Sequence, residues 1–254
     1  VKEKKIVFLL DVGGGSVIDA TKFIAVSVGF EGDPWDILSK GGEIKNALPL
    51  GTVLTLAATG SEMNERSVIS RVSTCEKLNF ASPLVFPKFS VLDPKVTYSL
   101  PARQVANGVV DSFIHVVEQY LTYPVNAKVQ DAFSEGLMRV IHEEGLKVLD
   151  NPNDYDIRAN LMWAATNALN VWIGQGVPQD WSSHRMGYAL TAQFGLDHAQ
   201  TLAILLPGVM TYMFKEKQVK LARMGEVVFG ITDGTEEERA RKAIVACEDF
   251  FRRM

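Results

Sequence analysis

The sequence predicts an α/β region followed by an all-helical region, with the boundary near residue 100. Two observations lead to this fold class. Before residue 100, short apolar runs end at Gly, Pro or Asp, which is typical of strands in a parallel sheet. After Pro101, apolar residues recur every three or four positions almost to the end of the chain, which indicates helices. We therefore expect two units, residues 1–99 and 100–254.

The individual elements follow from the same spacing. The apolar run 6–10 predicts a first strand that is buried on both faces, and residues 48–57, 68–71 and 89–93 predict further strands. Helical spacing predicts helices over residues 17–28, 105–120, 126–149, 155–172, 184–194, 200–214, 218–229 and 236–253. No internal repeat interrupts this order.

A glycine-rich turn, residues 11–19, joins the first strand to the first helix. Ser16 and Asp19 have the S-x-x-D spacing of a capping box at a helix start. Glycines allow close approach to the backbone, and free N–H groups at a helix N-terminus favour a phosphate. The turn lacks the G-x-G-x-x-G fingerprint, and similar turns also serve simple packing, so both interpretations stay open.

One predicted helix carries a carboxylate and an imidazole on the same face. Asp111 and His115 are four residues apart, just over one helical turn. His184 and His198 follow in apolar, glycine-containing settings. One carboxylate and three imidazoles suit Zn(II) or Fe(II) better than Mg(II) or Ca(II). The alternative is that an Asp-x-x-x-His pair is only a hydrogen-bonded feature of a helix. The fourth histidine, His142, is expected to be a solvated helix residue.

Composition limits the class of protein. The 254 residues are 47% hydrophobic and 22% charged, enough for one or two cores. A net charge of −4 gives no electrostatic case for binding nucleic acid or an anionic membrane. Cys75 and Cys247 lie far apart without a CxxC motif, which predicts reduced thiols in a cytoplasmic protein. No apolar run is long enough to span a bilayer, and no signal peptide is expected.

Together these motifs resemble the iron-dependent, or group III, alcohol dehydrogenases. The resemblance is strongest to the branch of butanol dehydrogenases and NADPH-dependent aldehyde reductases, and it extends essentially from end to end. It is carried by residues 12–19, 54–62, 91–94, 104–111, 176–181 and 197–203, and by the spacing of the Asp and His set.

The resemblance implies a partial dinucleotide-binding domain over residues 1–99 and an all-helical metal-binding domain over residues 100–254. One divalent ion, Fe²⁺ or alternatively Zn²⁺, would lie in a cleft between the domains. The ligands that the resemblance implies are Asp111, His115, His184 and His198.

The resemblance also implies a site for NADP(H), or alternatively NAD(H). The residues that would contact the cofactor are Gly13, Gly14, Gly15, Ser16, Asp19, Thr55, Thr59 and Lys77. The alternative for Lys77 is that it is a solvated loop lysine. Asn64 would lie near the mouth of the active site.

The activity implied is hydride transfer between NAD(P)H and small aldehydes or primary alcohols. The metal would polarise the substrate carbonyl, and the nicotinamide would carry the hydride. Two rival interpretations stay open. One is a polyol dehydrogenase or a dehydroquinate-synthase-like lyase on the same scaffold. The other is a truncated metal-binding member of the family with weak or no catalytic activity.

Two departures from the family pattern affect these expectations. Tyr188 stands where the family often has a second histidine, and a phenol with a pKa near 10 would relay protons poorly at neutral pH. Family members also usually begin several dozen residues earlier and continue for a few more helices. We therefore expect an incomplete dinucleotide domain whose first strand has an uncovered edge. Pairing through that edge predicts a homodimer or a higher oligomer.

Overall fold

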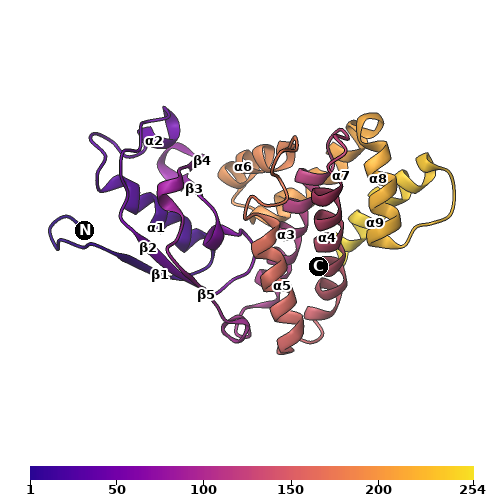
Figure 1. Cartoon of the computed structure of the whole chain (residues 1–254), viewed down its shortest axis with the longest axis horizontal. Coiled ribbons are helices and arrows are strands. Elements are labelled where there is room, and N and C mark those ends of the chain that lie inside the picture. Colours follow the sequence, from indigo (N-terminus) through magenta and orange to yellow (C-terminus); the bar gives the residue numbers. More distant parts are fainter.

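The structure is a computed structural model that describes residues 1–254. Figure 1 shows an elongated molecule with the strands at one end and a group of helices at the other. The predicted fold class, a parallel sheet followed by a helical region, is confirmed. The division into two domains near residue 100 stays a prediction.

The sheet contains three parallel strands in the order β1-β2-β5. Their bounds are β1 (Leu9–Gly13), β2 (Leu50–Leu54) and β5 (Ser90–Leu92). Helix α1 (Gly15–Ser27) covers one face, where Ile18 packs with Leu54 and Ala25 packs with Leu50. The carboxyl ends of the strands point toward the helical part (Figure 1), which is the edge where α/β sheets bind ligands.

The first strand differs from its prediction in two ways. It begins at Leu9 rather than at residue 6. It is also buried on one face only, because α1 covers that face and nothing covers the other. Leu10 and Val12 are therefore 59% and 62% exposed, whereas Asp11 between them is buried.

An antiparallel hairpin, β3 (Arg66–Arg71) and β4 (Glu76–Ala81), packs against α1. Strand β4 was not predicted, because Phe80 is its only buried side chain and no apolar alternation marks it. Short helices complete this part of the chain: α2 (Asp36–Ser39), η1 (Ser61–Met63), η2 (Val72–Thr74), η3 (Pro83–Val85) and η4 (Pro94–Thr97).

The helical part is built around α3 (Ala102–Tyr120), which packs against its neighbours on several sides. The other helices are α4 (Lys128–Val148), α5 (Tyr155–Ala168), α6 (Ser182–Phe194), α7 (His198–Tyr212), α8 (Phe214–Phe229) and α9 (Glu236–Arg253). Their positions agree with the predicted helices, although α5 ends at Ala168 rather than at residue 172. A core of 29 buried residues holds these helices together, with Phe113 of α3 near Phe250 at a centroid distance of 5.2 Å.

His142 is not the solvated residue that its charged neighbours predicted. Its ring is half-buried and lies edge-on to Phe229 and Phe250, at centroid distances of 5.1 and 4.9 Å. The reason is that α4 packs against α8 and α9, which local sequence does not reveal. Burial is the main cause of the lowered pKa of His142.

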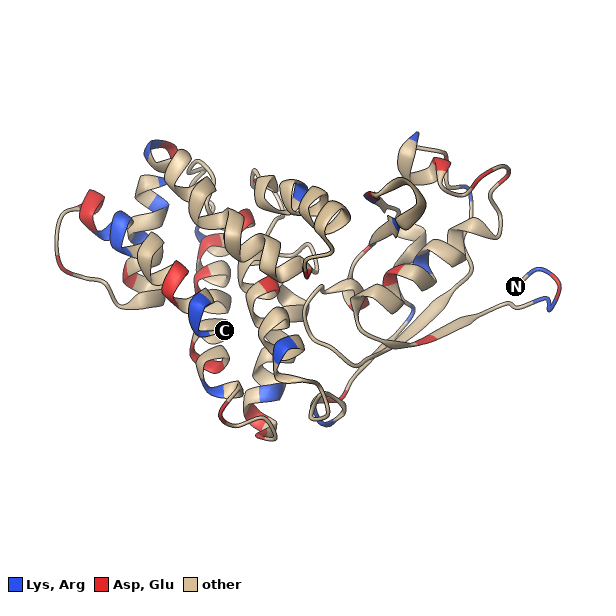
Figure 2. Cartoon of the chain, turned by 180° about the vertical axis from the view of Figure 1, so that it is seen from behind, with Lys and Arg blue, Asp and Glu red and all other residues tan.

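The surface of the helical part carries both signs of charge. Figure 2 shows Lys and Arg interspersed with Asp and Glu over these helices. None of the helices combines the length and the apolar character that a bilayer span requires.

Candidate functional site

Three helices bring one carboxylate and three imidazoles together. Asp111 and His115 project from the same face of α3, His184 lies in the first turn of α6, and His198 is the first residue of α7. Asp111 Oδ1 is 3.6 Å from His115 Nε2 and 3.7 Å from His184 Nε2. The same oxygen is 3.9 Å from His198 Nε2.

The spacing of these nitrogen and oxygen atoms suits joint binding of a divalent cation better than it suits hydrogen bonds between them. The three distances are too long for hydrogen bonds. Ligand atoms placed tetrahedrally about 2.1 Å from one ion would be separated by about 3.4 Å, close to the observed spacing. Asp111 Oδ1 and His184 Nε2 are also buried without any hydrogen-bond partner. Asp111, His184 and His198 offer ligand atoms that all lie within 4.8 Å of one another, and His115 is not part of this tighter group. His115 Nε2 approaches the set at Asp111 Oδ1.

Exposure differs across the set. Asp111, His115 and His184 are buried, whereas the side chain of His198 is 25% exposed. The arrangement is therefore closed on the side of α3 and open toward α7. An open side leaves room for a further ligand, which a catalytic metal site requires.

Burial and mutual charge set the protonation of these groups. Burial lowers the pKa of His115 to about 4 and the pKa of His198 to about 3. Burial would also raise the pKa of Asp111, but the neighbouring imidazoles outweigh it and hold that pKa well below its usual range. For His184 burial is likewise outweighed, here by Asp111 and Glu118, which raise its pKa to about 9. A cation bound by this set must displace the proton of His184.

Glu118 is a functional candidate that the sequence reasoning missed. One of its oxygens pairs with His184 Nδ1, and Oε1 accepts a hydrogen bond from the N–H of Ser183 at 2.6 Å. A carboxylate on the far nitrogen of a ligating histidine fixes the orientation of the ring and raises its basicity. The signal was present, because Asp111, His115 and Glu118 follow the i, i+4, i+7 spacing of one helix face.

The starts of α6 and α7 are anchored to α3. The N–H of Asp180 donates to Glu118 O at 2.9 Å, and Lys217 Nζ contacts Asp180 Oδ2 at 2.7 Å. Asp197 begins α7 in a capping box with Gln200. Its Oδ2 accepts from Arg103 Nε at 2.7 Å and from Asn107 Nδ2 at 2.8 Å. These contacts fix the backbone next to His184 and His198, which sequence spacing could not foresee.

The glycines of the turn are required by packing. A Cβ on Gly15 would come within 2.4 Å of Thr59, and one on Gly13 within 2.5 Å of Val17. A Cβ on Gly14 would lie 3.0 Å from Leu56. None of the three has a positive φ, so the cause is close packing. The segment after β2 crowds Gly14 and Gly15, and the first turn of α1 crowds Gly13.

The predicted capping box at this turn is wrong. Gly14 is the N-cap of α1 and no side chain caps the helix, while Ser16 is exposed. Asp19 is buried and accepts hydrogen bonds from Ser61 Oγ at 2.5 Å and from the N–H of Val68 at 2.9 Å. Asp19 therefore ties α1 to η1 and β3. The first N–H groups of α1 stay open at the helix end, where an anion can be bound.

Two other predicted residues lie beside this turn. The N–H of Thr55 donates to Gly13 O at 3.0 Å, which holds the end of β2 against the turn. The side chain of Thr59 occupies the space that a Cβ on Gly15 would need. Asn64 is buried, and its amide bonds to Gly60 O, to Leu169 O and to the N–H of Arg66. Its side chain thus supports the loop, rather than lying free at the mouth of a site.

Lys77 lies between the turn and the candidate metal ligands. Its ammonium group is 5.2 Å from the ring centroid of Tyr188, and that ring is 5.6 Å from the ring of His198. Burial lowers the pKa of Lys77, and the charges of Asp111 and Asp19 partly offset that effect. Burial is also the main cause that raises the pKa of Tyr188 to about 12.

Comparison with known proteins identifies the family. A family model described as "Iron-containing alcohol dehydrogenase" matches residues 1–94. A second, described as "Fe-containing alcohol dehydrogenase family, C-terminal", matches residues 105–254. The chain belongs to the iron-containing alcohol dehydrogenase family. The metal set and the glycine-rich turn fall within these two matched regions.

Similar members of this family are known from several bacteria. The chain is 56% identical to the NADPH-dependent aldehyde reductase YqhD of Escherichia coli K12, over 100% of this chain and 66% of that protein. It is 43% identical to a probable NADH-dependent butanol dehydrogenase of Bacillus subtilis, over 98% of this chain and 65% of that protein. The chain thus spans about two thirds of the length of these relatives.

Solved structures of the family share the fold. The crystal structure of E. coli K-12 YqhD matches with a TM-score of 0.98 and 55% identity, over 100% of this chain and 66% of that one. The structure of NADH-dependent butanol dehydrogenase A from Thermotoga maritima matches with a TM-score of 0.95 and 36% identity, over 99% of this chain and 63% of that one.

Proposed function

We propose that the chain is a metal-dependent oxidoreductase that transfers a hydride between NAD(P)H and small aldehydes or primary alcohols. The observation that carries the proposal is that three histidine Nε2 atoms lie 3.6 to 3.9 Å from Asp111 Oδ1, with His115 and His184 buried and His198 partly exposed. The names of similar proteins, an aldehyde reductase and a butanol dehydrogenase, support the same class of reaction.

Asp111, His115, His184 and His198 would hold one divalent ion, Fe²⁺ as the family description suggests or Zn²⁺ as the alternative. When bound, such an ion supplies Lewis-acid polarisation of a carbonyl oxygen. The protein's part is to present lone pairs from orphaned buried atoms and to leave the side of His198 open. Glu118 would keep the proton of His184 on Nδ1, away from the ion.

The cofactor would lie along the edge formed by the strand ends. Residues 13–16 would receive the pyrophosphate at the open end of α1, with Asp19 behind them. Thr55 and Thr59 flank the turn, and the ammonium of Lys77 would attract a phosphate or ribose oxygen between the turn and His198. NADP(H) is favoured by the more similar relative, and NAD(H) is the alternative that the butanol dehydrogenase supports.

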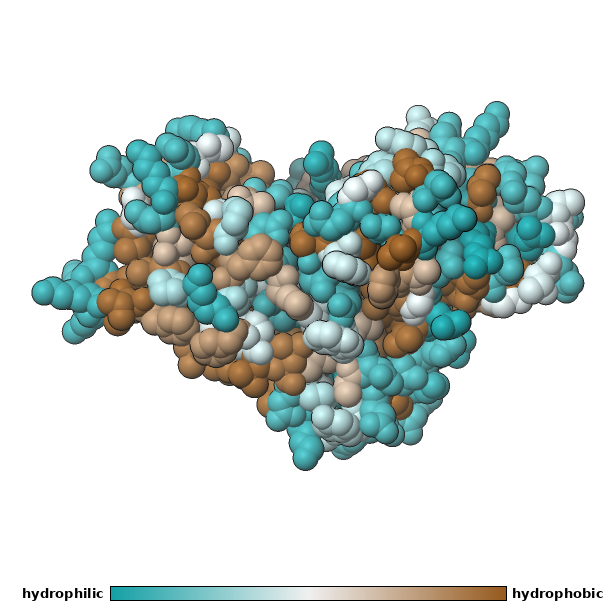
Figure 3. Space-filling view, viewed as in Figure 1, coloured by the Kyte–Doolittle hydropathy of each residue, from teal (hydrophilic) through white to brown (hydrophobic).

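A homodimer or higher oligomer belongs to the same proposal. One edge of β1 has no neighbouring strand, and Leu10 and Val12 are exposed on the bare face of the sheet. Val91 of β5 continues this exposed face. Figure 3 shows apolar side chains gathered at this end of the molecule. A cytoplasmic location, which Cys75 and Cys247 favour as free thiols, also stays part of the proposal.

The test is turnover of short aldehydes with NADPH after separate reconstitution with Fe(II) and Zn(II). We expect NADPH oxidation that is lost in His198→Ala together with most of the bound metal. His142→Gln is the matched control, because it changes a histidine outside the site and should keep metal and activity. A folded, fully metal-loaded protein that oxidises no NADPH would instead favour a metal-binding family member without catalysis. Unchanged metal content in His198→Ala would reject the ligand set.

A further inference from the structure

Tyr188 links the candidate metal ligands to the sheet-bearing part of the molecule. It lies on α6 one turn after His184, and it is half-buried. Its ring centroid is 5.6 Å from that of His198, with the two ring planes tilted by 32°. The ammonium of Lys77, on strand β4, is 5.2 Å from the same phenol centroid. The phenol ring therefore fills space between the metal ligands and the part of the chain where the cofactor is proposed to bind.

Close packing of α6 against α7 holds Tyr188 beside His198. A Cβ on Gly187, the residue before Tyr188, would come within 2.7 Å of Thr201 Oγ1. Thr201 Oγ1 in turn donates a hydrogen bond to His198 O at 2.7 Å. Tyr188 and His198 are thus carried by two helix turns that pack directly on each other. The backbone of Tyr188 cannot move away from His198 without separating the two helices.

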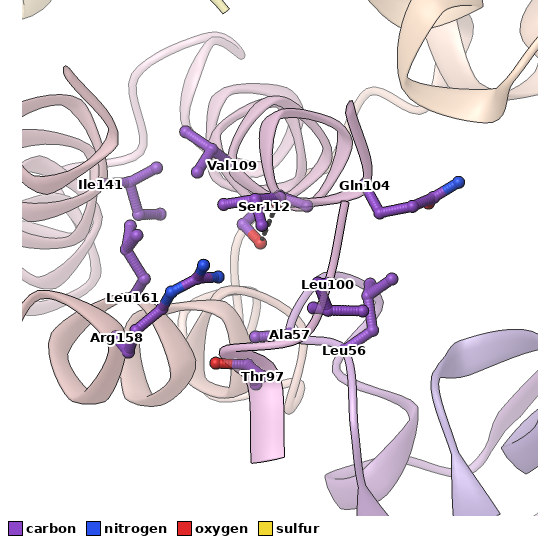
Figure 4. Close-up of a pocket in the computed structure, with 12 residues that line it drawn as sticks. Leu56, Ala57, Thr97, Leu100, Gln104, Val109, Ser112, Ile141, Arg158 and Leu161 are labelled. Carbon is purple, nitrogen blue, oxygen red and sulfur yellow. Dashed lines mark hydrogen bonds between the residues drawn. The ribbon is translucent and has the colours of Figure 1, made fainter. Parts of the chain in front are cut away.

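The side of His198 is the one by which a substrate can reach the metal. The ligand set is closed toward α3, and only His198 is partly exposed. Where α3 meets α5 and the segment after β2, a narrow pocket lies between Ala57, Ser112 and Arg158 (Figure 4), with a volume of about 30 Å³. One water needs about 10–15 Å³ by this measure, so an aldehyde with several carbons does not fit there. The substrate must therefore pass Tyr188.

We propose that the Tyr188 ring selects aldehydes that are unbranched at the carbon next to the carbonyl. The inference rests on the proposed function, because the metal has to hold the substrate oxygen. An oxygen bound on the open side lies next to the His198 ring, and the Tyr188 ring occupies the adjoining space. A methyl branch beside the carbonyl would meet this ring. Carbons further along an unbranched chain lie farther from the metal and are not limited in this way.

The test compares kcat/KM for butyraldehyde and isobutyraldehyde with NADPH. The wild type should favour butyraldehyde by about 10-fold or more, the usual effect of one methyl group in a fitted pocket. Tyr188→Ala should react with both at similar rates, whereas Tyr188→Phe keeps the ring and should keep the preference. Tyr212→Ala is the matched control, because Tyr212 is 87% exposed at the end of α7. An unchanged preference in Tyr188→Ala, or its loss in Tyr188→Phe, would overturn the proposal.

A second measurement needs no turnover and no variant. The Co(II)-substituted wild type would be titrated with n-butanethiol and isobutanethiol, whose sulfur stands in for the substrate oxygen, and followed by its visible absorption. The straight thiol should bind about 10-fold more tightly, for the same steric reason. This preference in a protein that reduces no aldehyde would reject the proposed function alone. Equal affinities for the two thiols would overturn the role of Tyr188 and leave the proposed function untouched.

Discussion

Replacing Glu118 with Gln should weaken metal binding without removing a metal ligand. The N–H of Ser183 requires an acceptor at Oε1, at 2.6 Å, so the amide oxygen of Gln must occupy that position. The amide NH₂ then faces His184 Nδ1 and donates to it, whereas Glu118 accepts there. His184 would then favour the tautomer that carries its proton on Nε2, the atom that faces Asp111 and would bind the metal.

The expected loss of metal affinity is moderate, because the variant loses the carboxylate that orients His184 and keeps every metal ligand. Changes to groups that orient metal-binding histidines weaken metal affinity by about 10–100-fold, or about 1.4–2.7 kcal/mol. Competition with a chromophoric chelator would measure the affinity for Zn(II). Glu226→Gln, an exposed change on α8, is the control, and circular dichroism would show that each variant is folded. Wild-type affinity in Glu118→Gln would refute the assigned role of this hydrogen bond.

Three further changes separate cofactor binding, stability and association. Gly14→Val should weaken NADPH binding in calorimetric titration but keep the metal, because its side chain would press on Leu56, 3.0 Å from the Cβ position. If the variant instead lost metal and kept its affinity for NADPH, the assignments of the cofactor site and the metal site would be the wrong way round. Lys217→Met should lower the free energy of unfolding by about 2–3 kcal/mol in urea, less than for a fully buried pair because Asp180 is a quarter exposed. Burial raises the pKa of Asp180, but Lys217 and Ser182 outweigh it and lower that pKa, so the stabilisation is present above pH 4 and is lost as the pH falls through the folded value. On acidification the free energy of unfolding of Lys217→Met should therefore fall less than that of the wild type. An equal fall in both proteins would contradict this. Val12→Lys should give a monomer by light scattering if the bare face of the sheet mediates association, and an unchanged mass would exclude that face.

The helices were predictable because their apolar residues recur every three or four positions. Helix α9 buries one regular stripe, whereas α3 is buried on nearly all sides, and both were located within a few residues. Strand β4 escaped prediction because it buries only Phe80 and gains its order from pairing with β3. The burial of β1 was overestimated because an apolar run does not reveal how many faces its neighbours cover.

For the site, local spacing placed Asp111 and His115 on one face, and it could also have identified Glu118. The convergence of His184 and His198 on that face depends on tertiary anchors, and the family resemblance alone suggested it. Asp19 was misassigned for a related reason. Its short distance from Ser16 in sequence suggested a cap, whereas Ser61, distant in sequence, satisfies it in the fold.

Metal removal should destabilise the whole helical part, because the candidate ligands are mounted on its central helix. With His184 protonated and the other two imidazoles neutral, Asp111 and Glu118 leave the buried set with a net charge of −1. A divalent ion that displaces the proton of His184 brings this charge to zero.

Neutralising a buried charge favours the folded, metal-bound state. At a free metal concentration 100 times Kd, the linkage contributes about 2.7 kcal/mol, which corresponds to a rise in Tm of roughly 5–10 °C for a chain of this size. Thermal unfolding with EDTA and with saturating Zn(II) would measure this shift. Because His198→Ala lacks one ligand, its shift should be much smaller, whereas His142→Gln should behave as the wild type does. If the wild type unfolded at the same temperature with and without metal, these residues would not form a metal site that is coupled to the stability of the fold.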